Sequence, residues 1–237
     1  MNGCIVPISG GLDSTVLLHY AVKQAHHGDG YDEVYAISFN YGQRHKKELK
    51  FAQEQSKLLN VPLDAIDLTD LSKIADSSLT NTDTDVAKTR DVLGDAQTVN
   101  YVPFRNTIML SICCAKAESV GASAVFHGAA QVDTQAGYWD GSREYMVALN
   151  GLVSLNRKNR IQVGSPLINK TKAEIIAWGV ELGVDFSKTW TCYEGKKKAC
   201  GECPACSSRI MGFLEAGIKD PVPYSIKIPW KKHLTTV

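Results

Sequence analysis

Residues 3–15 limit what this chain can fold into more than any other stretch. An apolar run, Gly3-Cys-Ile-Val-Pro-Ile8, breaks into Ser-Gly-Gly and then continues as Leu-Asp-Ser-Thr. Glycines turn without a Cβ penalty, and Asp, Ser and Thr favour helix starts, so the pattern predicts strand, tight loop and helix. The backbone N–H groups of such a loop, with the positive end of the helix dipole, form a site for phosphate. No lysine precedes Ser14, so the loop is not a Walker loop.

The stretch Ser-Gly-Gly-Leu-Asp-Ser at positions 9–14 resembles the Ser-Gly-Gly-x-Asp-Ser signature of the N-type ATP pyrophosphatases. The resemblance implies that the loop holds the leaving pyrophosphate while a substrate oxygen attacks the α-phosphate of ATP. The alternative is an ordinary Gly-rich turn with a good helix cap. On the resemblance, the nucleotide contacts are Ser9, Gly10, Gly11, Leu12, Asp13 and Ser14.

Length and charge exclude several classes of protein. The 237 residues suffice for one large domain or a domain with an appendage, and 44% hydrophobic residues can form a core. The formal net charge of +1 creates no global field that would recruit nucleic acid or an anionic membrane. We find no targeting segment and no apolar stretch long enough to span a bilayer, so we expect a cytoplasmic protein.

Four of the seven cysteines lie within fifteen residues, with the spacing Cys-x7-Cys-x2-Cys-x2-Cys. In a reducing compartment such a cluster is better explained as a tetrahedral zinc site than as disulfides. Iron–sulfur ligation is an open alternative, although nothing else in the segment suggests redox work. The predicted ligands of a structural zinc ion are Cys192, Cys200, Cys203 and Cys206.

Strand and helix patterns alternate along the chain, which predicts an α/β fold with a doubly wound parallel sheet. Residues 76–98 are rich in Asp, Thr and Ser and are expected to form a long, partly mobile loop. We expect a nucleotide-binding domain at 1–190 and a zinc-binding segment at 191–237 packed against it. The predicted strands are 33–40, 62–68, 124–127 and 161–164, and the predicted helices are 14–26, 46–59 and 107–120.

Polar residues gather where the predicted strands end. In an open α/β sheet the ligand crevice lies at the carboxyl ends of the strands beside the topological switch. Arg105 at a helix entrance offers donors to phosphate, and Lys172 beside the capping box of Thr171 and Glu174 is a second candidate phosphate contact. Further candidates for nucleotide contacts are Asn40, Tyr41, Gln43, Arg44, Asn106 and Gly128.

Five motifs follow one another across nearly the whole chain, and together they resemble the 7-cyano-7-deazaguanine synthase family of the queuosine pathway. They are the phosphate loop, Phe39-Asn-Tyr-Gly-Gln-Arg-His45, Val102-Pro-Phe-Arg-Asn106, Leu167-Ile-Asn-Lys-Thr-Lys-Ala-Glu-Ile175 and Trp190-Thr-Cys-Tyr-Glu-Gly195. The resemblance implies an adenine nucleotide alpha hydrolase-like fold and a homodimer. It also implies that ATP activates the carboxylate of 7-carboxy-7-deazaguanine, that ammonia gives the amide, and that a second activation gives the nitrile.

The implied reaction needs residues that hold charge. Adenylation turns a carboxylate, a poor electrophile, into a mixed anhydride that ammonia can attack. Magnesium could bridge the phosphates through Asp13, and Arg105 and Lys172 could neutralise the remaining negative charge of the phosphates. No residue stands out as the base for ammonium. The predicted catalytic residues are Asp13, Ser14, Arg105 and Lys172, and the predicted substrate contacts are Gln131, Asp133, Tyr138, Asp140 and Arg143.

One stretch departs from the family pattern. Where the synthases have Gly-Tyr-Pro-Asp-Cys-Arg-Pro-Glu-Phe, this chain has Gly137-Tyr-Trp-Asp-Gly-Ser-Arg-Glu-Tyr145. A relative with a changed acceptor side could stop at the amide, or transfer the activated acyl group to another amine, including one on a protein. A non-enzymatic alternative is a zinc-ribbon nucleic-acid binder, suggested by lysines at 196–198 and 227–232.

Overall fold

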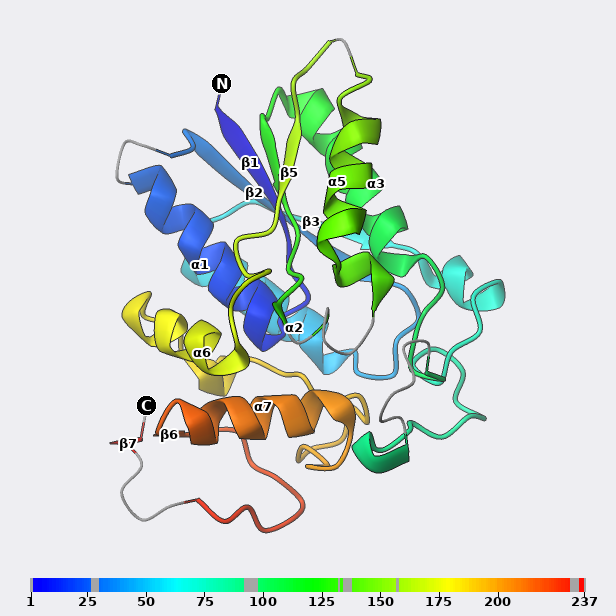
Figure 1. Cartoon of the computed structure of the whole chain (residues 1–237), viewed down its shortest axis with the longest axis vertical. Coiled ribbons are helices and arrows are strands. Elements are labelled where there is room, and N and C mark those ends of the chain that lie inside the picture. Colours follow the sequence, from blue (N-terminus) through cyan, green and yellow to red (C-terminus); the bar gives the residue numbers. More distant parts are fainter. Residues whose placement is uncertain are drawn as a thin grey trace.

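The computed structural model describes residues 2–26, 30–91, 98–131, 133, 138–156, 158–230 and 235–236. Its centre is a five-stranded parallel sheet in the order β3-β2-β1-β4-β5 (Figure 1). The predicted doubly wound parallel sheet is therefore confirmed. The strands are β1 (Gly3–Pro7), β2 (Glu33–Asn40), β3 (Leu63–Asp67), β4 (Ala124–Phe126) and β5 (Gln162–Gly164).

Helices cover both faces of the sheet. Neighbouring residues of a strand point to opposite faces, and in β1 the residues on both faces are apolar and buried. In β1, Cys4 and Val6 pack in one cluster with α1, α2, α6 and α7, whereas Ile5 packs in another with α3 and α5. Figure 1 shows these two helical layers. The helices are α1 (Leu12–His26), α2 (Lys47–Leu58), α3 (Arg105–Val120), α5 (Arg143–Val153), α6 (Lys172–Glu181) and α7 (Pro204–Glu215).

The strand order places a topological switch between β1 and β4. The chain runs outward from β1 through β2 to β3, and then returns to the other side of β1 as β4. The loops that follow β1 and β4 therefore diverge at their carboxyl ends and leave a crevice there. The phosphate loop between β1 and α1 lines this crevice.

Helices α5 and α7 were not predicted from the sequence. Helix α5 begins immediately after Ser142, whose hydroxyl oxygen accepts a hydrogen bond from the Tyr145 backbone N–H (3.0 Å). Helix α7 begins with Pro204 at its first position, where a missing N–H has no cost. Its buried Arg209 binds the Asp220 carboxylate through two nitrogens (2.7 and 2.9 Å), which holds the chain after α7 against the core.

The described part of the predicted loop, residues 76–91, is held by hydrogen bonds. Arg44 donates to the carbonyl oxygens of Asn81 and Thr84, both at 2.7 Å. At the other end, the Thr89 N–H donates to the Glu202 carbonyl (3.0 Å) in the cysteine-rich segment. Residues 92–97 of the loop lie outside the described residues. Among the helices that are described, none is both long and apolar enough to cross a membrane.

Candidate active site

A cavity of about 340 Å³ lies at the carboxyl ends of β1, β2 and β4. Its walls come from several parts of the chain, among them the phosphate loop, the exit of β2, the start of α3, the exit of β4, residues 138–141 and the cysteine-rich segment. The fold therefore brings together segments that are far apart in sequence: Ser9 of the phosphate loop and Thr191 of the cysteine-rich segment are more than 180 residues apart. We refer to this cavity as the crevice.

The phosphate loop has the conformation that its glycines allow. Gly10 has a φ of 84°, and a Cβ built on it would lie 2.1 Å from the carbonyl oxygen of Glu48 in α2. Ser9 and Ser14 are joined by a hydrogen bond between their hydroxyl oxygens (3.0 Å). The loop is thus clamped between α1 and α2, with its N–H groups at the start of α1, where anions bind best.

Lys172 reaches the phosphate loop from α6. Its Nζ lies 2.5 Å from Asp13 Oδ1, and the lysine side chain is only 13% exposed. A Cβ at Gly212 in α7 would lie 2.4 Å from Lys172 Cγ, so the glycine makes room for the lysine chain. The capping box of Thr171 and Glu174, predicted from the sequence, fixes the start of α6. Lys172 is therefore positioned as a cation beside the anion site.

Arg105 forms the opposite wall of the crevice. Its Nη1 donates to the Tyr41 hydroxyl (3.3 Å), and its guanidinium carbon lies 5.5 Å from the centre of the Tyr41 ring. Asn106 and Asp140 are next to it in the lining of the crevice. Arg105 is half-buried, and its Nε donates to Asn106 Oδ1 (3.4 Å). The planar fork of a guanidinium is suited to an anion such as a carboxylate or phosphate.

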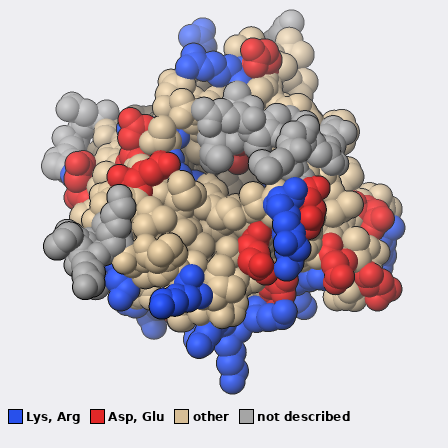
Figure 2. All heavy atoms as spheres, turned by 60° about the horizontal axis from the view of Figure 1, so that its bottom comes forward, with Lys and Arg blue, Asp and Glu red and all other residues tan. Residues whose placement is uncertain are grey.

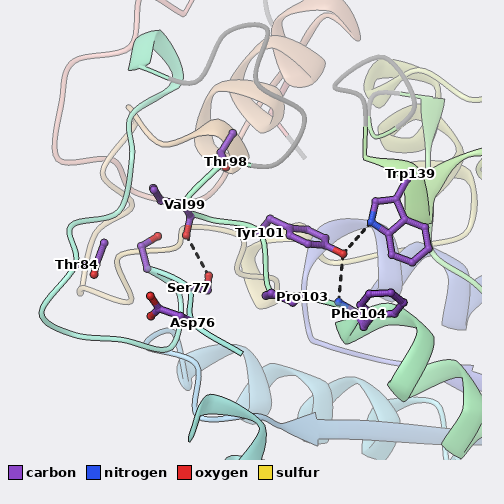
Figure 3. Close-up of a pocket in the computed structure, with 10 residues that line it drawn as sticks. Asp76, Ser77, Thr84, Thr98, Val99, Tyr101, Pro103, Phe104 and Trp139 are labelled. Carbon is purple, nitrogen blue, oxygen red and sulfur yellow. Dashed lines mark hydrogen bonds between the residues drawn. The ribbon is translucent and has the colours of Figure 1, made fainter. Parts of the chain in front are cut away.

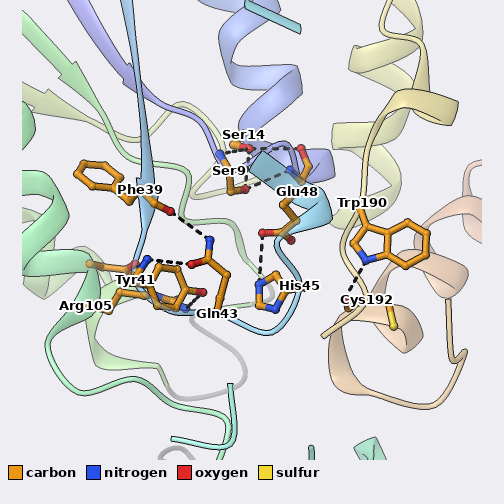
Figure 4. A network of polar contacts seen from close by, with 12 residues as sticks. Ser9, Ser14, Phe39, Tyr41, Gln43, His45, Glu48, Arg105, Trp190 and Cys192 are labelled. Carbon is orange, nitrogen blue, oxygen red and sulfur yellow. Dashed lines mark hydrogen bonds and ion pairs between the residues drawn. The ribbon is translucent and has the colours of Figure 1, made fainter. Parts of the chain in front are cut away.

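The loop after β2 is organised from within (Figure 4). The Gln43 side chain donates to the Phe39 carbonyl (3.1 Å) and accepts from the Tyr41 N–H (2.8 Å), which turns the Tyr41 ring toward Arg105. His45 Nε2 lies 3.3 Å from Glu48 Oε2, and both residues line the crevice. Asn40 instead accepts a hydrogen bond from the Gly42 N–H, at 3.3 Å.

The segment between β4 and α5 contributes three ionisable groups to the crevice, His127, Asp133 and Asp140. Burial raises the pKa of Asp133, although the nearby charge of Lys172 acts to lower it. Burial likewise raises the pKa of Asp140, although the nearby charge of Arg105 acts to lower it. His127 follows β4 directly; burial and then the nearby Arg105 lower its pKa to about 4. His127 is therefore a neutral imidazole at neutral pH. Residues 132 and 134–137 of the predicted substrate segment lie outside the described residues.

A second, more open cavity of about 800 Å³ adjoins the crevice (Figure 3). Tyr101 lines both cavities. Its hydroxyl oxygen accepts hydrogen bonds from Trp139 Nε1 (2.8 Å) and from the Phe104 N–H (3.2 Å). Trp139, which stands where the family pattern has proline, therefore lines this cavity. Its hydrogen bond holds the Tyr101 ring, which borders both cavities.

The four clustered cysteines fit a zinc ion. Their Sγ atoms all lie within 4.8 Å of one another, as four ligands of one tetrahedral ion require. Backbone N–H groups also donate to the sulfurs: Cys200 N–H to Cys192 Sγ, and Cys203 N–H to Cys200 Sγ, both at 3.3 Å. Such donors stabilise thiolates. Four thiolates close the coordination shell, so the site is suited to a structural zinc ion rather than a catalytic one.

Most of the predicted site residues meet at the crevice. Those among its lining residues are Ser9, Gly11, Leu12, Asp13, Ser14, Tyr41, Gln43, Arg105, Asn106, Gly128, Asp133, Tyr138 and Asp140, and Lys172 joins them through Asp13. Five others are not among its lining residues. Gly10 packs against the Glu48 carbonyl, Asn40 accepts a hydrogen bond within its own loop, and Arg44 donates to carbonyl oxygens of the 76–91 loop. Arg143 donates to Asn169 Oδ1, and the Gln131 N–H donates to the Lys170 carbonyl.

Several residues that line the crevice were not predicted as individual candidates, among them His45, Glu48, His127 and Tyr193. His45 and Tyr193 lie inside motifs that the sequence analysis had singled out, and His127 ends a predicted strand. Glu48 carried the weakest signal, because a glutamate in the first turn of a helix ordinarily stabilises the helix dipole.

Comparison with known proteins assigns the family. Residues 3–217 match the family model described as "Queuosine biosynthesis protein QueC". A 7-cyano-7-deazaguanine synthase of Thermoplasma volcanium is 42% identical over 93% of this chain and 90% of its own length. A 7-cyano-7-deazaguanine synthase of Ralstonia pickettii is 44% identical over 93% of this chain and 97% of its own length.

Solved structures support the fold. The U34-tRNA thiolase NcsA from Methanococcus maripaludis, solved with its [4Fe-4S] cluster, superposes with a TM-score of 0.50 at 16% identity. The match covers 81% of this chain and 60% of that one, so it bears on the fold alone. The family model and the curated relatives together cover the sheet, the crevice and the cysteine cluster, and the chain therefore belongs to the QueC family of queuosine biosynthesis proteins.

Proposed function

We propose that this protein is an ATP-dependent carbon–nitrogen ligase that converts 7-carboxy-7-deazaguanine, through its amide, to 7-cyano-7-deazaguanine. The observation that carries the proposal is the phosphate loop with Lys172 on Asp13, in a chain whose relatives are named for this product. Each of the two activations releases AMP and pyrophosphate. The substrates are small molecules: the deazaguanine carboxylate, ATP and ammonia.

In this proposal the phosphate end of the crevice holds ATP. The N–H groups of residues 9–14 and the ammonium of Lys172 bind the β- and γ-phosphates, and Ser14 orients them. Magnesium fits here because Lys172 contacts Oδ1 of Asp13, which leaves Oδ2 as one ligand beside the phosphate oxygens. Bound there, the ion would neutralise the leaving pyrophosphate.

The other end of the crevice would receive the deazaguanine. Arg105 binds the carboxylate of the substrate and then stabilises the negative charge that develops at the α-phosphate. Such electrostatic stabilisation is strongest in a site from which water is excluded. Asp133, Tyr138 and Asp140 face the same space and supply acceptors and a ring for a planar base. Tyr41, held by Arg105, covers the nucleotide.

The proposal includes the arrangement of the chain. Residues 1–190 form the ATP pyrophosphatase domain, and the zinc-binding segment 191–237 supplies Thr191 and Tyr193 to the crevice. The cysteines are free, which suits the reducing cytoplasm. We propose that the protein forms a homodimer, as the family resemblance implies.

The departure from the family pattern at residues 137–145 supports two alternatives: a reaction that stops at the amide, or transfer of the activated acyl group to another amine. Trp139 of this stretch lines the second cavity, where a different acceptor would bind. Nucleic-acid binding is less well supported, since acidic side chains accompany the basic ones on the face that includes the C-terminal end of the fold (Figure 2).

Product analysis tests the proposal. The purified protein is incubated with ATP, magnesium, ammonium and 7-carboxy-7-deazaguanine, and the products are identified by mass spectrometry while AMP and pyrophosphate are counted. Nitrile with two AMP for each product is the expected result. Amide with one AMP supports the alternative, and no AMP in any mixture would contradict a ligase.

A further inference from the structure

Residues 100–106 and 138–141 line both the crevice and the second cavity. Phe104 lines the second cavity, whereas the next residue, Arg105, lines the crevice. In the other stretch, Trp139 lines the second cavity, and the residues on either side of it line the crevice. The two stretches therefore form a wall between the two cavities, which we call the shared wall.

Hydrogen bonds to the Tyr101 hydroxyl join the two stretches (Figure 3). Tyr101 lines both cavities. Its hydroxyl oxygen accepts from Trp139 Nε1 (2.8 Å) across the wall and from the Phe104 N–H (3.2 Å) beside it. The Trp139 and Phe104 rings meet edge to face, with their centres 5.2 Å apart. The bond from Trp139 to Tyr101 thus closes the shared wall at the ring that borders both cavities.

The backbone of Phe104 is strained at this wall. Its φ of 54° and ψ of 12° lie in the left-handed region, which is unfavourable for a residue with a Cβ. The residue is also 59% exposed, so burial of its ring in the core does not account for the conformation. Strain of this kind is characteristic of sites that bind or position a ligand.

The groups that line the second cavity are suited to a cation. Its described lining includes one carboxylate, Asp76, and no lysine or arginine. Aromatic faces such as those of Tyr101 and Trp139 attract an ammonium ion within about 6 Å. Hydroxyl oxygens, which can accept hydrogen bonds from an ammonium ion, are present on Ser77, Ser78, Thr84 and Thr98. ATP and a carboxylate are anions, and their cationic partners lie at the crevice instead.

The order of the proposed reaction gives the amine a separate approach. ATP and the deazaguanine carboxylate must react first, because the amine attacks the activated carboxylate. Both of them then occupy the crevice, with the carboxylate at Arg105. Arg105 follows Phe104 directly, so an amine in the second cavity is separated from the carboxylate by the shared wall alone.

We infer that the second cavity binds the acceptor amine as ammonium, and that Trp139 and Tyr101 limit the size of the amine that passes the shared wall. Ammonium gives one proton to water in the open cavity and passes the Tyr101 ring as ammonia. The inference rests on the proposed function, because it names the binding site and the size limit of the second substrate of that reaction.

The test compares amines of different size. Activation is measured without an amine, as the exchange of labelled pyrophosphate into ATP that depends on 7-carboxy-7-deazaguanine. Amide formation is then measured with ammonium and with methylamine, and mass spectrometry distinguishes the two amides. One extra carbon in a fitted site costs about 10–200-fold in kcat/KM, so the wild-type protein should prefer ammonium by a factor in that range.

Trp139→Ala should relax this preference. We expect the ratio of kcat/KM for methylamine to that for ammonium to rise about 10-fold, with the exchange retained. Trp139→Phe keeps a ring against Phe104 but removes the N–H that holds Tyr101, so the ratio should rise by a smaller factor. Trp178→Phe is the matched control. Trp178 is also half-buried, with its ring 4.6 Å from that of Tyr20, and it lines neither cavity.

Asp76→Asn tests the charge of the second cavity. KM for ammonium should rise about 2–5-fold, the effect of losing one exposed charge contact. KM for hydroxylamine, which is uncharged at neutral pH, should stay the same. Asp70→Asn is the control, because Asp70 is an exposed carboxylate that lines neither cavity.

The outcomes separate the inference from the proposed function. An unchanged ratio in Trp139→Ala with the exchange intact would overturn the size limit. Loss of the exchange in both Trp139 variants would make this residue part of the activation site and would also overturn the inference. Equal changes in KM for ammonium and hydroxylamine in Asp76→Asn would overturn the ammonium site. If the wild-type protein shows no exchange, the proposed function itself fails.

Discussion

The backbone N–H of Trp190 donates a hydrogen bond to the carbonyl oxygen of Gly10, at 2.9 Å. Two residues later comes Cys192, the first of the four clustered cysteines, and the Trp190 indole N–H donates to the Cys192 carbonyl (3.0 Å). Lys47 of α2 lies over the same indole, with Nζ 3.6 Å from the ring centre. The cysteine cluster and the phosphate loop are thus joined by a short, buried path, and a change in one should alter the other.

Cys203→Ser should remove zinc and weaken the phosphate loop together. Loss of one of four thiolates opens the coordination shell, and structural zinc sites contribute directly to folding. We expect zinc content, measured by atomic absorption, and the midpoint of thermal unfolding to fall together, with pyrophosphate exchange lost as well. Cys114→Ser, at a half-buried cysteine outside the cluster, is the control and should retain zinc. Normal stability and exchange in zinc-free Cys203→Ser would show that the cluster is not structural.

Gly10→Ala should abolish activation. The φ of 84° disfavours any residue with a Cβ, and the added carbon would lie 2.1 Å from the Glu48 carbonyl oxygen. The left-handed conformation alone costs about 1–2 kcal/mol, and the clash with backbone adds to it. Urea unfolding and pyrophosphate exchange measure the two effects.

Gly151→Ala is the matched control for that glycine. Gly151 lies in α5, and a Cβ there would meet no atom within 4 Å. Alanine is the better helix former, so this variant should be more stable by about 1 kcal/mol and retain exchange. Similar behaviour of the two variants would mean that the conformation of Gly10 has no special role.

Lys172→Met should impair ATP use without unfolding the protein. The substitution keeps much of the aliphatic chain against Gly212 but removes the ammonium beside Asp13. We expect kcat/KM for ATP to fall by about 10²–10³, the effect of losing one positioned electrostatic contact. Lys170→Met is the control, because Lys170 Nζ lies over the Trp178 ring at 4.8 Å, outside the crevice lining. A comparable loss in both variants would argue for a general effect of charge.

Sequence patterns predicted the parts of this molecule that depend on local chemistry. The strand at 33–40 was predicted with its observed bounds, because Val34, Ala36, Ile37 and Phe39 form the apolar run of a buried parallel strand. The capping box is likewise a local property and is confirmed. Cysteine spacing alone was enough to predict a cluster whose sulfurs do converge.

What the sequence did not predict depends on contacts between distant residues. Arg44 was expected at the nucleotide, yet it binds carbonyl oxygens of residues 81 and 84 in a loop whose path no local pattern describes. The pairing of Asp13 with Lys172 joins residues far apart in sequence through the packing of α1 against α6. Helix α5 was missed because Gly141 and Ser142 were considered only as a departure from a family motif, although Ser142 caps the helix.

His127 should make the stability of the protein depend on pH. Its pKa is lowered to about 4, by burial first and by Arg105 second, from about 6.5 in the unfolded chain. Between these values the unfolded state binds more protons, so stability is fully present above about pH 6.5 and falls as the pH decreases toward about 4. The difference between these two pKa values corresponds to about 3 kcal/mol. His127→Gln, which cannot be protonated, should have a flatter dependence of the unfolding free energy on pH, measured by urea titration between these two values. An equally steep decline in the variant would assign the acid sensitivity to other groups, and the buried imidazole would then be able to gain a proton without loss of the fold.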